Sequence, residues 1–139
     1  MVDLWHDWRV SLILASLCWG AWGFFGKIAV ARLGWPTTMV VGWIIGLAVV
    51  APVVVARFRW QGLVASWPAM VYGLGGALGA MFLMRALERG PAVAVLPMSE
   101  LWLVVSVGLS AAFLGEELNW QRGLGLALVL AGAALLGRE

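Results

Sequence analysis

Long apolar segments separated by short polar joints make up almost the whole chain. A hydrocarbon core of about 30 Å takes about 20 helical residues at roughly 1.5 Å each, and each apolar segment is close to that length. The pattern predicts five membrane-spanning helices, at residues 10–31, 36–56, 67–87, 92–114 and 120–137. Because the joints are short, we expect consecutive helices to pack as neighbours in one domain covering residues 1–139.

The joints carry residues that end one helix and begin the next. Pro36 suits a first helical turn, Gly90-Pro91 ends the third helix, and Asn119 can cap the fifth. Tryptophans gather near the predicted span ends, which is typical of an aromatic belt at a membrane interface. These tryptophans are Trp5, Trp8, Trp35, Trp60, Trp67 and Trp120.

The composition favours lipid over water as the solvent. The chain is 63% hydrophobic and 12% charged, whereas an ordinary soluble domain is about half apolar and roughly a quarter charged. A soluble domain of this size cannot hide so much apolar surface. We therefore expect an all-α, multi-pass protein of the cytoplasmic (inner) membrane. There is no basic run, so nucleic acid is not expected as a partner.

The basic residues give almost no signal for orientation, which normally follows an excess of Lys and Arg on the cytoplasmic side. Five spans place the termini on opposite sides of the membrane. The N-terminal side receives four basic residues, Arg9, Arg57, Arg59 and Arg122. The other side receives five, Lys27, Arg32, Arg85, Arg89 and Arg138. The balance suggests a dual topology, in which the chain inserts both ways and works as an antiparallel homodimer. The alternative is one orientation set by a partner or by other cues.

Several short motifs resemble a known family. In the C-terminal half they are Ala86-Leu87, Gly90-Pro91-Ala92, Pro97, Phe113-Leu114-Gly115-Glu116, Gln121, Gly123 and Gly132. Near the N-terminus, Trp19-Gly20 is followed by Lys27. Together, in this order and spacing, the motifs resemble the EamA-type repeat of the drug/metabolite transporter superfamily.

This resemblance implies a fold. Most members of the superfamily carry ten helices as two inverted five-helix repeats, and this chain resembles the short bacterial and archaeal members that have one. Two copies in opposite orientations would rebuild the inverted repeat, in agreement with the balanced charges. The sequence departs from the family pattern at Glu100, where a small or hydroxyl residue is common, and at 101–103, where a further proline often occurs.

Glu100 is the main candidate for function. It lies about eight residues into the fourth span, ~12 Å from the boundary and near the midplane. A charge at this depth costs at least a few kcal/mol, and ionisable residues inside membranes usually serve transport. The alternative is a paired or protonated Glu100 that fixes helix packing. Lys27, ~6 Å below the same boundary, can pair with Glu100 or extend to the interface, and Arg85 is a competing partner.

Aromatic and hydroxyl side chains extend the candidate substrate or proton site. Trp19 and Trp22 share one face of the first helix, and with Tyr72 they can surround an organic cation. Trp43 and Trp102 also lie inside their spans, away from the ends. Ser99 belongs to a stripe beside Glu100 that either hydrates a pathway or bonds back to its own helix. Plain packing or lipid contact is the alternative for each tryptophan.

Small residues predict close helix packing, within one protomer or between two. The third helix carries Gly75 and Gly79, and the fifth carries Gly125, Ala127, Ala131 and Gly132. We expect the fifth helix to form the dimer face, by analogy with the family.

The leading interpretation is a proton-coupled secondary transporter, an antiporter for a small organic solute that is cationic or amphipathic. The alternative is a non-transporting membrane subunit that only packs with another membrane protein. No Ser/His/Asp set, phosphate loop or cluster of metal ligands is present, so neither enzymatic activity nor a cofactor or metal is expected.

Overall fold

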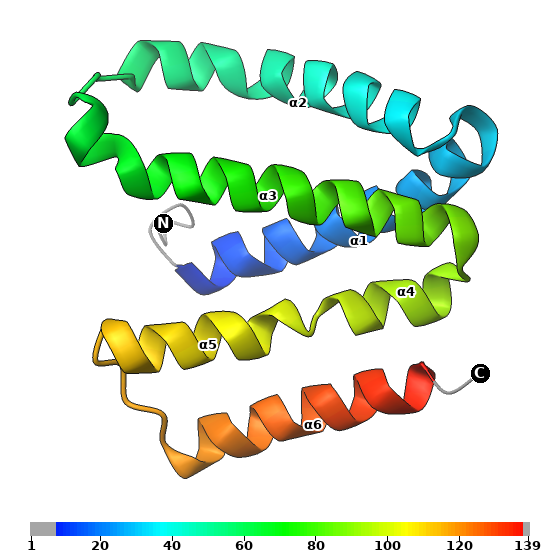
Figure 1. The fold of residues 1–139 in the computed structure, drawn as a ribbon, viewed down its shortest axis with the longest axis vertical. Helices are drawn as coiled ribbons and strands as arrows, with labels where there is room; N and C mark the ends of the chain where they lie inside the picture. Colours follow the sequence, from blue (N-terminus) through cyan, green and yellow to red (C-terminus); the bar gives the residue numbers. More distant parts are fainter. Residues whose placement is uncertain (1–7, 138–139) are drawn as a thin grey trace. The chain divides into compact units, whose positions relative to one another are not determined.

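The computed structural model describes residues 8–137, so Trp5 and Arg138 of the sequence predictions lie outside the described part. In it the chain is helical, without strands (Figure 1). The helices are α1 (Trp8–Leu33), α2 (Trp35–Arg57), α3 (Leu63–Arg89), α4 (Ala92–Ser99), α5 (Trp102–Phe113) and α6 (Trp120–Leu136).

The predicted all-α membrane fold is confirmed. By length and hydropathy α1, α2 and α3 can each cross a membrane, and so can the stretch Ala92–Phe113 taken as one segment. The fifth predicted span corresponds to α6, a shorter apolar helix of 17 residues. Its first turn is capped by the Asn119 side chain, which accepts a 2.9 Å hydrogen bond from the backbone N–H of Arg122. The predicted capping role of Asn119 is therefore confirmed.

The fourth predicted span differs from the prediction, because it is two helices and not one. α4 ends at Ser99 and α5 begins at Trp102, with Glu100 and Leu101 in a turn between them. The Ser99 hydroxyl donates a 2.6 Å hydrogen bond to the Leu96 carbonyl. In a continuous α-helix that carbonyl would accept from the Glu100 N–H, which instead donates to the Pro97 carbonyl at 3.2 Å. Pro97 inside α4 has no N–H to donate to the helix, and the Ser99 hydroxyl adds a second donor at the Leu96 carbonyl. Both favour the local change to tighter i+3 bonding.

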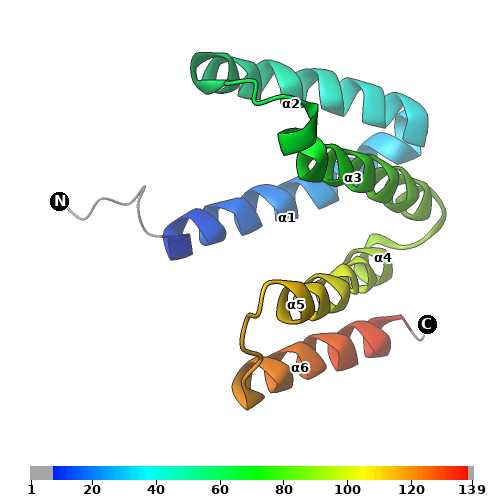
Figure 2. The same ribbon diagram turned by 60° about the vertical axis from the view of Figure 1, so that its left-hand side comes forward.

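The chain divides into two compact units, and the first contains α1, α2 and α3. Figures 1 and 2 show α1 meeting α3 at the end where α1 gives way to α2, and diverging from it towards its own N-terminus. The buried apolar side chains of this unit are Val30, Met84 and Leu87, all near that end. Packing in the first unit is therefore concentrated where the three helices meet.

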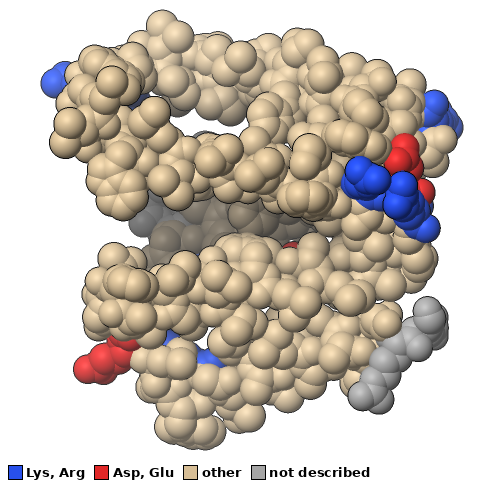
Figure 3. Space-filling model, in the orientation of Figure 1, with Lys and Arg blue, Asp and Glu red and all other residues tan. Residues whose placement is uncertain are grey.

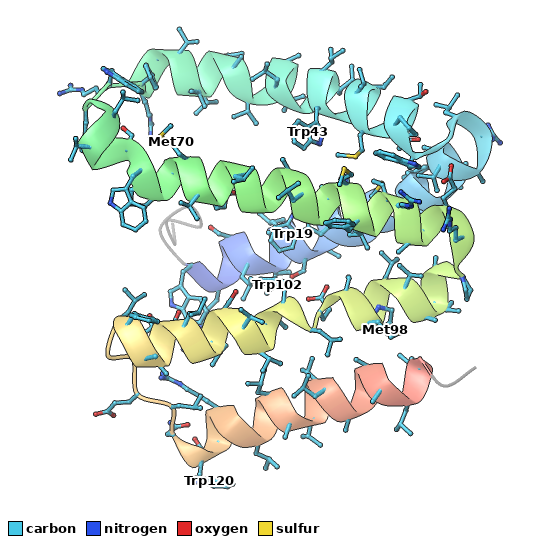
Figure 4. The ribbon with its side chains drawn as sticks, viewed as in Figure 1. Trp19, Trp43, Met70, Met98, Trp102 and Trp120 are labelled. Carbon is cyan, nitrogen blue, oxygen red and sulfur yellow. The ribbon has the colours of Figure 1, made fainter. Side chains whose placement is uncertain are left out.

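The second unit contains α4, α5 and α6. Among the residues of this unit up to Gly137, Ala133 of α6 is the buried apolar one. Met98, labelled in Figure 4, packs against the end of α6, so that a Cβ added to Gly137 would lie 2.5 Å from its Sδ atom. The absence of a side chain at Gly137 allows this close approach of α4 and α6.

Most large apolar side chains in the described residues are exposed, and no polar or charged side chain is buried. On the face seen in Figure 3, the visible charged groups of the first unit lie at the ends of its helices, with an uncharged surface between them. This distribution suits helices that lipid surrounds along their middle and water reaches at their ends.

Candidate functional site

Lys27 joins α1 to the C-terminal end of α3. Its Nζ donates a 2.6 Å hydrogen bond to the carbonyl oxygen of Leu87, and Leu87 is itself completely buried. The last carbonyls of a helix have no partner in the helix and carry a partial negative charge. The ammonium group therefore stabilises the end of α3 while holding α1 beside it.

Glu88 forms a second link at the same end of the first unit. Its Oε1 accepts a 3.2 Å hydrogen bond from the backbone N–H of Trp35, the first residue of α2. Gly34 precedes α2 with φ of 75°, a conformation that favours glycine. Because glycine has no side chain, Gly34 cannot cap the helix itself. A carboxylate from α3 thus satisfies the N-terminus of α2, where negative charge is favourable.

A cavity of about 280 Å³ lies in the first unit, towards this linked end. It is partly open to the surroundings, and Trp22, Phe25 and Trp43 on its walls are exposed over about half of their surface or more. Its walls come from α1, α2 and α3 and include Trp22, Phe25, Thr38, Met39, Trp43 and Met84. No ionisable side chain is among the described residues that line it. Figure 4 shows Trp43 on the side of α2 that faces α3.

The structure brings together only some of the predicted aromatic residues. Trp22 and Trp43 share the cavity, although they come from different helices. Trp19 and Tyr72 do not line it, and Tyr72 is 83% exposed. Phe25, Met39 and Met84 also line the cavity and were not predicted, because spacing along one helix does not reveal which residues of another helix it faces.

In the second unit, Glu100 occupies the turn between α4 and α5 and is exposed. No described side chain of this unit makes a hydrogen bond or ion pair with its carboxylate. Ser99 is adjacent, with its hydroxyl committed to the Leu96 carbonyl, and Trp102 begins α5 with about half of its surface exposed. Pairing between Lys27 and Glu100 stays a prediction, as do the roles of Ser99 and Trp102 in a site.

The small residues predicted for helix packing face open space within their own units. A Cβ added at Gly75, Gly79, Gly125 or Gly132 would meet no atom within 4 Å. Ala127 and Ala131 are exposed on α6. Close packing at these positions inside a unit is therefore not observed, and their use between protomers stays a prediction.

The long apolar helices define a multi-pass membrane protein, and the comparisons with known proteins give its class. The model of the EamA-like transporter family matches residues 8–138. The chain therefore belongs to the EamA-like transporter family, so it is a membrane transporter. Membership points to transport rather than to enzymatic catalysis, and it agrees with the resemblance seen in the sequence motifs.

Two relatives match over nearly their whole length. An uncharacterized transporter in the cobO 3' region of a Sinorhizobium species is 31% identical over 136 residues, covering 94% of this chain and 96% of the relative. An uncharacterized protein of Methanocaldococcus jannaschii is 26% identical over 131 residues, covering 89% of this chain and 91% of the relative. No solved structure matches the chain.

Proposed function

We propose that this protein is a proton-coupled secondary transporter, an antiporter that moves a small organic solute, cationic or amphipathic, across the cytoplasmic membrane. The observation that carries the proposal is the position of Glu100, in a turn that interrupts the apolar stretch Ala92–Phe113. In secondary transporters, substrates and coupling ions bind near the midplane, typically where helices are discontinuous. A carboxylate at such a break can release a proton when a solute binds and recover it afterwards.

We further propose that two copies assemble as an antiparallel homodimer. The relatives are covered over 96% and 91% of their lengths, so a unit of about this size recurs in other members. The exposed face of α6 carries Ala127 and Ala131 one turn apart, flanked by exposed Leu124, Leu128 and Leu135. Small residues at this spacing suit close contact with a second helix in a membrane. The nearly equal numbers of basic residues on the two sides favour opposite orientations.

Proton release from purified protein in detergent tests the coupling role of Glu100. A panel of small organic cations and amphipathic compounds is added in weakly buffered solution, and the pH change is recorded. We expect one class of compound to release protons from the wild type but not from Glu100→Gln, whose side chain cannot ionise. Glu100→Asp retains a carboxylate and is the matched control, with reduced but measurable release.

Flux into proteoliposomes under an imposed pH gradient then tests transport itself. Wild-type protein is expected to drive uptake of the responding compound, and Glu100→Gln is expected to abolish it. Uptake by Glu100→Gln with unchanged pH dependence would overturn the coupling proposal. Labelling of tags at both termini in intact cells tests the dimer proposal, because a single uniform orientation rules out the antiparallel assembly.

A further inference from the structure

We infer that the cavity of the first unit binds an uncharged, ring-shaped apolar group, which is the apolar part of the transported solute. The inference deepens the proposed function and rests on it, because it names the chemical class of one part of the transported solute. The cavity lies between α1, α2 and α3, and all of its lining residues belong to this unit. Glu100 belongs to the second unit and is not among the lining residues.

The lining has the chemistry of a site for a flat apolar ring. Trp22 and Phe25 come from α1, and Trp43 comes from α2. Aromatic side chains pack against other rings in stacked or edge-to-face arrangements, which add to the free energy of burying apolar surface. The thioethers of Met39 and Met84 adapt to irregular shapes and make favourable contacts with ring edges. A flexible acyl chain would gain less from such walls.

The hydroxyl and ammonium groups near the cavity already have partners in the protein. Thr38 lines the cavity, and its hydroxyl donates a 2.9 Å hydrogen bond to the Gly34 carbonyl. Lys27 follows the lining residue Gly26, and its ammonium group donates to the Leu87 carbonyl. No carboxylate is among the lining residues. A charged group entering this space would lose water without gaining an opposite charge, which favours an uncharged group.

The volume sets the size of the group. An apolar cavity of roughly 150 Å³ in another protein binds benzene, and this cavity has about 280 Å³. It therefore has room for a bicyclic ring such as indole. Pockets that enclose a whole drug-sized ligand span about 300–1,000 Å³. The cavity thus holds the ring of an amphipathic solute, whose polar part lies outside it.

This site differs from the aromatic box predicted from the sequence. The predicted box combined Trp19, Trp22 and Tyr72 around an organic cation, and only Trp22 lines the cavity. Cation–π attraction requires the charge to lie over a ring face. In the inferred site the solute's ring occupies the cavity, and any positive charge is recognised elsewhere.

Glycines on α2 provide a matched pair of variants for the test. Gly42 lines the cavity, and a Cβ added there would meet no atom within 4 Å. Gly42→Leu therefore fills the cavity without displacing a neighbour of the Cβ position. Gly46 lies one turn further along α2, has the same open surroundings and does not line the cavity. Gly46→Leu controls for the general effect of a leucine in this helix.

Fluorine NMR of 5-fluoroindole measures binding to the protein in lipid nanodiscs, with empty nanodiscs as background. We expect saturable binding to the wild type and to Gly46→Leu, and at least tenfold weaker binding to Gly42→Leu. Trp43→Leu removes one aromatic wall and keeps an apolar side chain, so it should weaken binding several-fold. This second variant keeps the test decisive if Gly42→Leu does not fold.

If binding of 5-fluoroindole does not saturate above the nanodisc background, the inference is overturned, because lipid acyl chains would then occupy the cavity. Equal affinity in wild type, Gly42→Leu and Trp43→Leu would also overturn it, by placing the ring elsewhere. The measurement needs neither a pH gradient nor transport. Failure of ring binding is therefore distinguishable from failure of proton coupling, which the flux assay reports.

Discussion

The ammonium nitrogen of Lys27 lies 2.6 Å from the carbonyl oxygen of Leu87, which places a cation of α1 on the last turn of α3. The sequence predicted that Lys27 either takes part in the site beside Glu100 or extends to the membrane interface. The hydrogen bond gives Lys27 a positioning role that requires no solute. The ammonium group stabilises the C-terminal end of α3, and the cavity lies beside this end. This relationship and the neighbouring bond from Trp35 to Glu88 explain why packing of the first unit is concentrated at one end.

Replacing Lys27 by methionine should destabilise the protein. Methionine keeps a long apolar stem but loses the charged donor, so the free energy of unfolding is expected to fall by about 1–2 kcal/mol. Unfolding in mixed micelles, followed by tryptophan fluorescence, measures the change. Lys27→Arg keeps the cation and should retain most of the stability. Unchanged stability in Lys27→Met would contradict the positioning role.

Loss of the Glu88 carboxylate should loosen the start of α2. Glu88→Ala removes the acceptor for the Trp35 N–H, and a lost cap at a helix N-terminus costs roughly 0.5–1 kcal/mol. Glu88→Gln retains an acceptor oxygen without the charge and should show a smaller loss. Hydrogen exchange at the Trp35 amide reports the effect directly. If Glu88→Ala and wild type exchange at the same rate, the bond does not protect this helix end.

Removing the Ser99 hydroxyl should make the fourth span more continuous. In Ser99→Ala the Leu96 carbonyl becomes available to the Glu100 N–H, as in an ordinary α-helix. One net hydrogen bond of about 1 kcal/mol corresponds to roughly fivefold greater protection of the Glu100 amide from exchange. Ser99→Thr keeps the hydroxyl and should behave like the wild type. Equal exchange in all three proteins would show that the hydroxyl does not cause the break.

Asn119 should be needed for a stable first turn of α6. Asn119→Ala removes the acceptor for the Arg122 N–H, with an expected cost of about 1 kcal/mol in the free energy of unfolding. Asn119→Asp replaces the amide oxygen by a carboxylate oxygen, which is also a good N-cap acceptor, and should preserve the cap. The same micelle unfolding experiment, combined with exchange at the Arg122 amide, checks both. If the cap contributes nothing to stability, Asn119→Ala will have the same unfolding midpoint as the wild type and the same exchange rate at the Arg122 amide.

The sequence alone determined which segments of this protein are apolar and helical. Runs of about 20 apolar residues identify membrane helices because lipid cannot satisfy exposed backbone groups, so each run must be helical whatever its neighbours are. Local signals also located the helix ends, as with Asn119, whose capping bond depends only on residues three positions apart. The family could likewise be recognised from the order of short motifs.

Only the tertiary structure decided which side chains meet. The partners of Lys27 and Glu88 lie 60 and 53 positions away along the chain, and helical periodicity says nothing about such contacts. Trp22 and Trp43 share a cavity for the same reason, because helix crossing brings their faces together. The break at Glu100 depends on local hydrogen bonds around Leu96 and Pro97, which the apolar pattern does not reveal. Apolar pattern fixes which segments are helices in lipid, whereas the packing of particular surfaces fixes where a solute can bind.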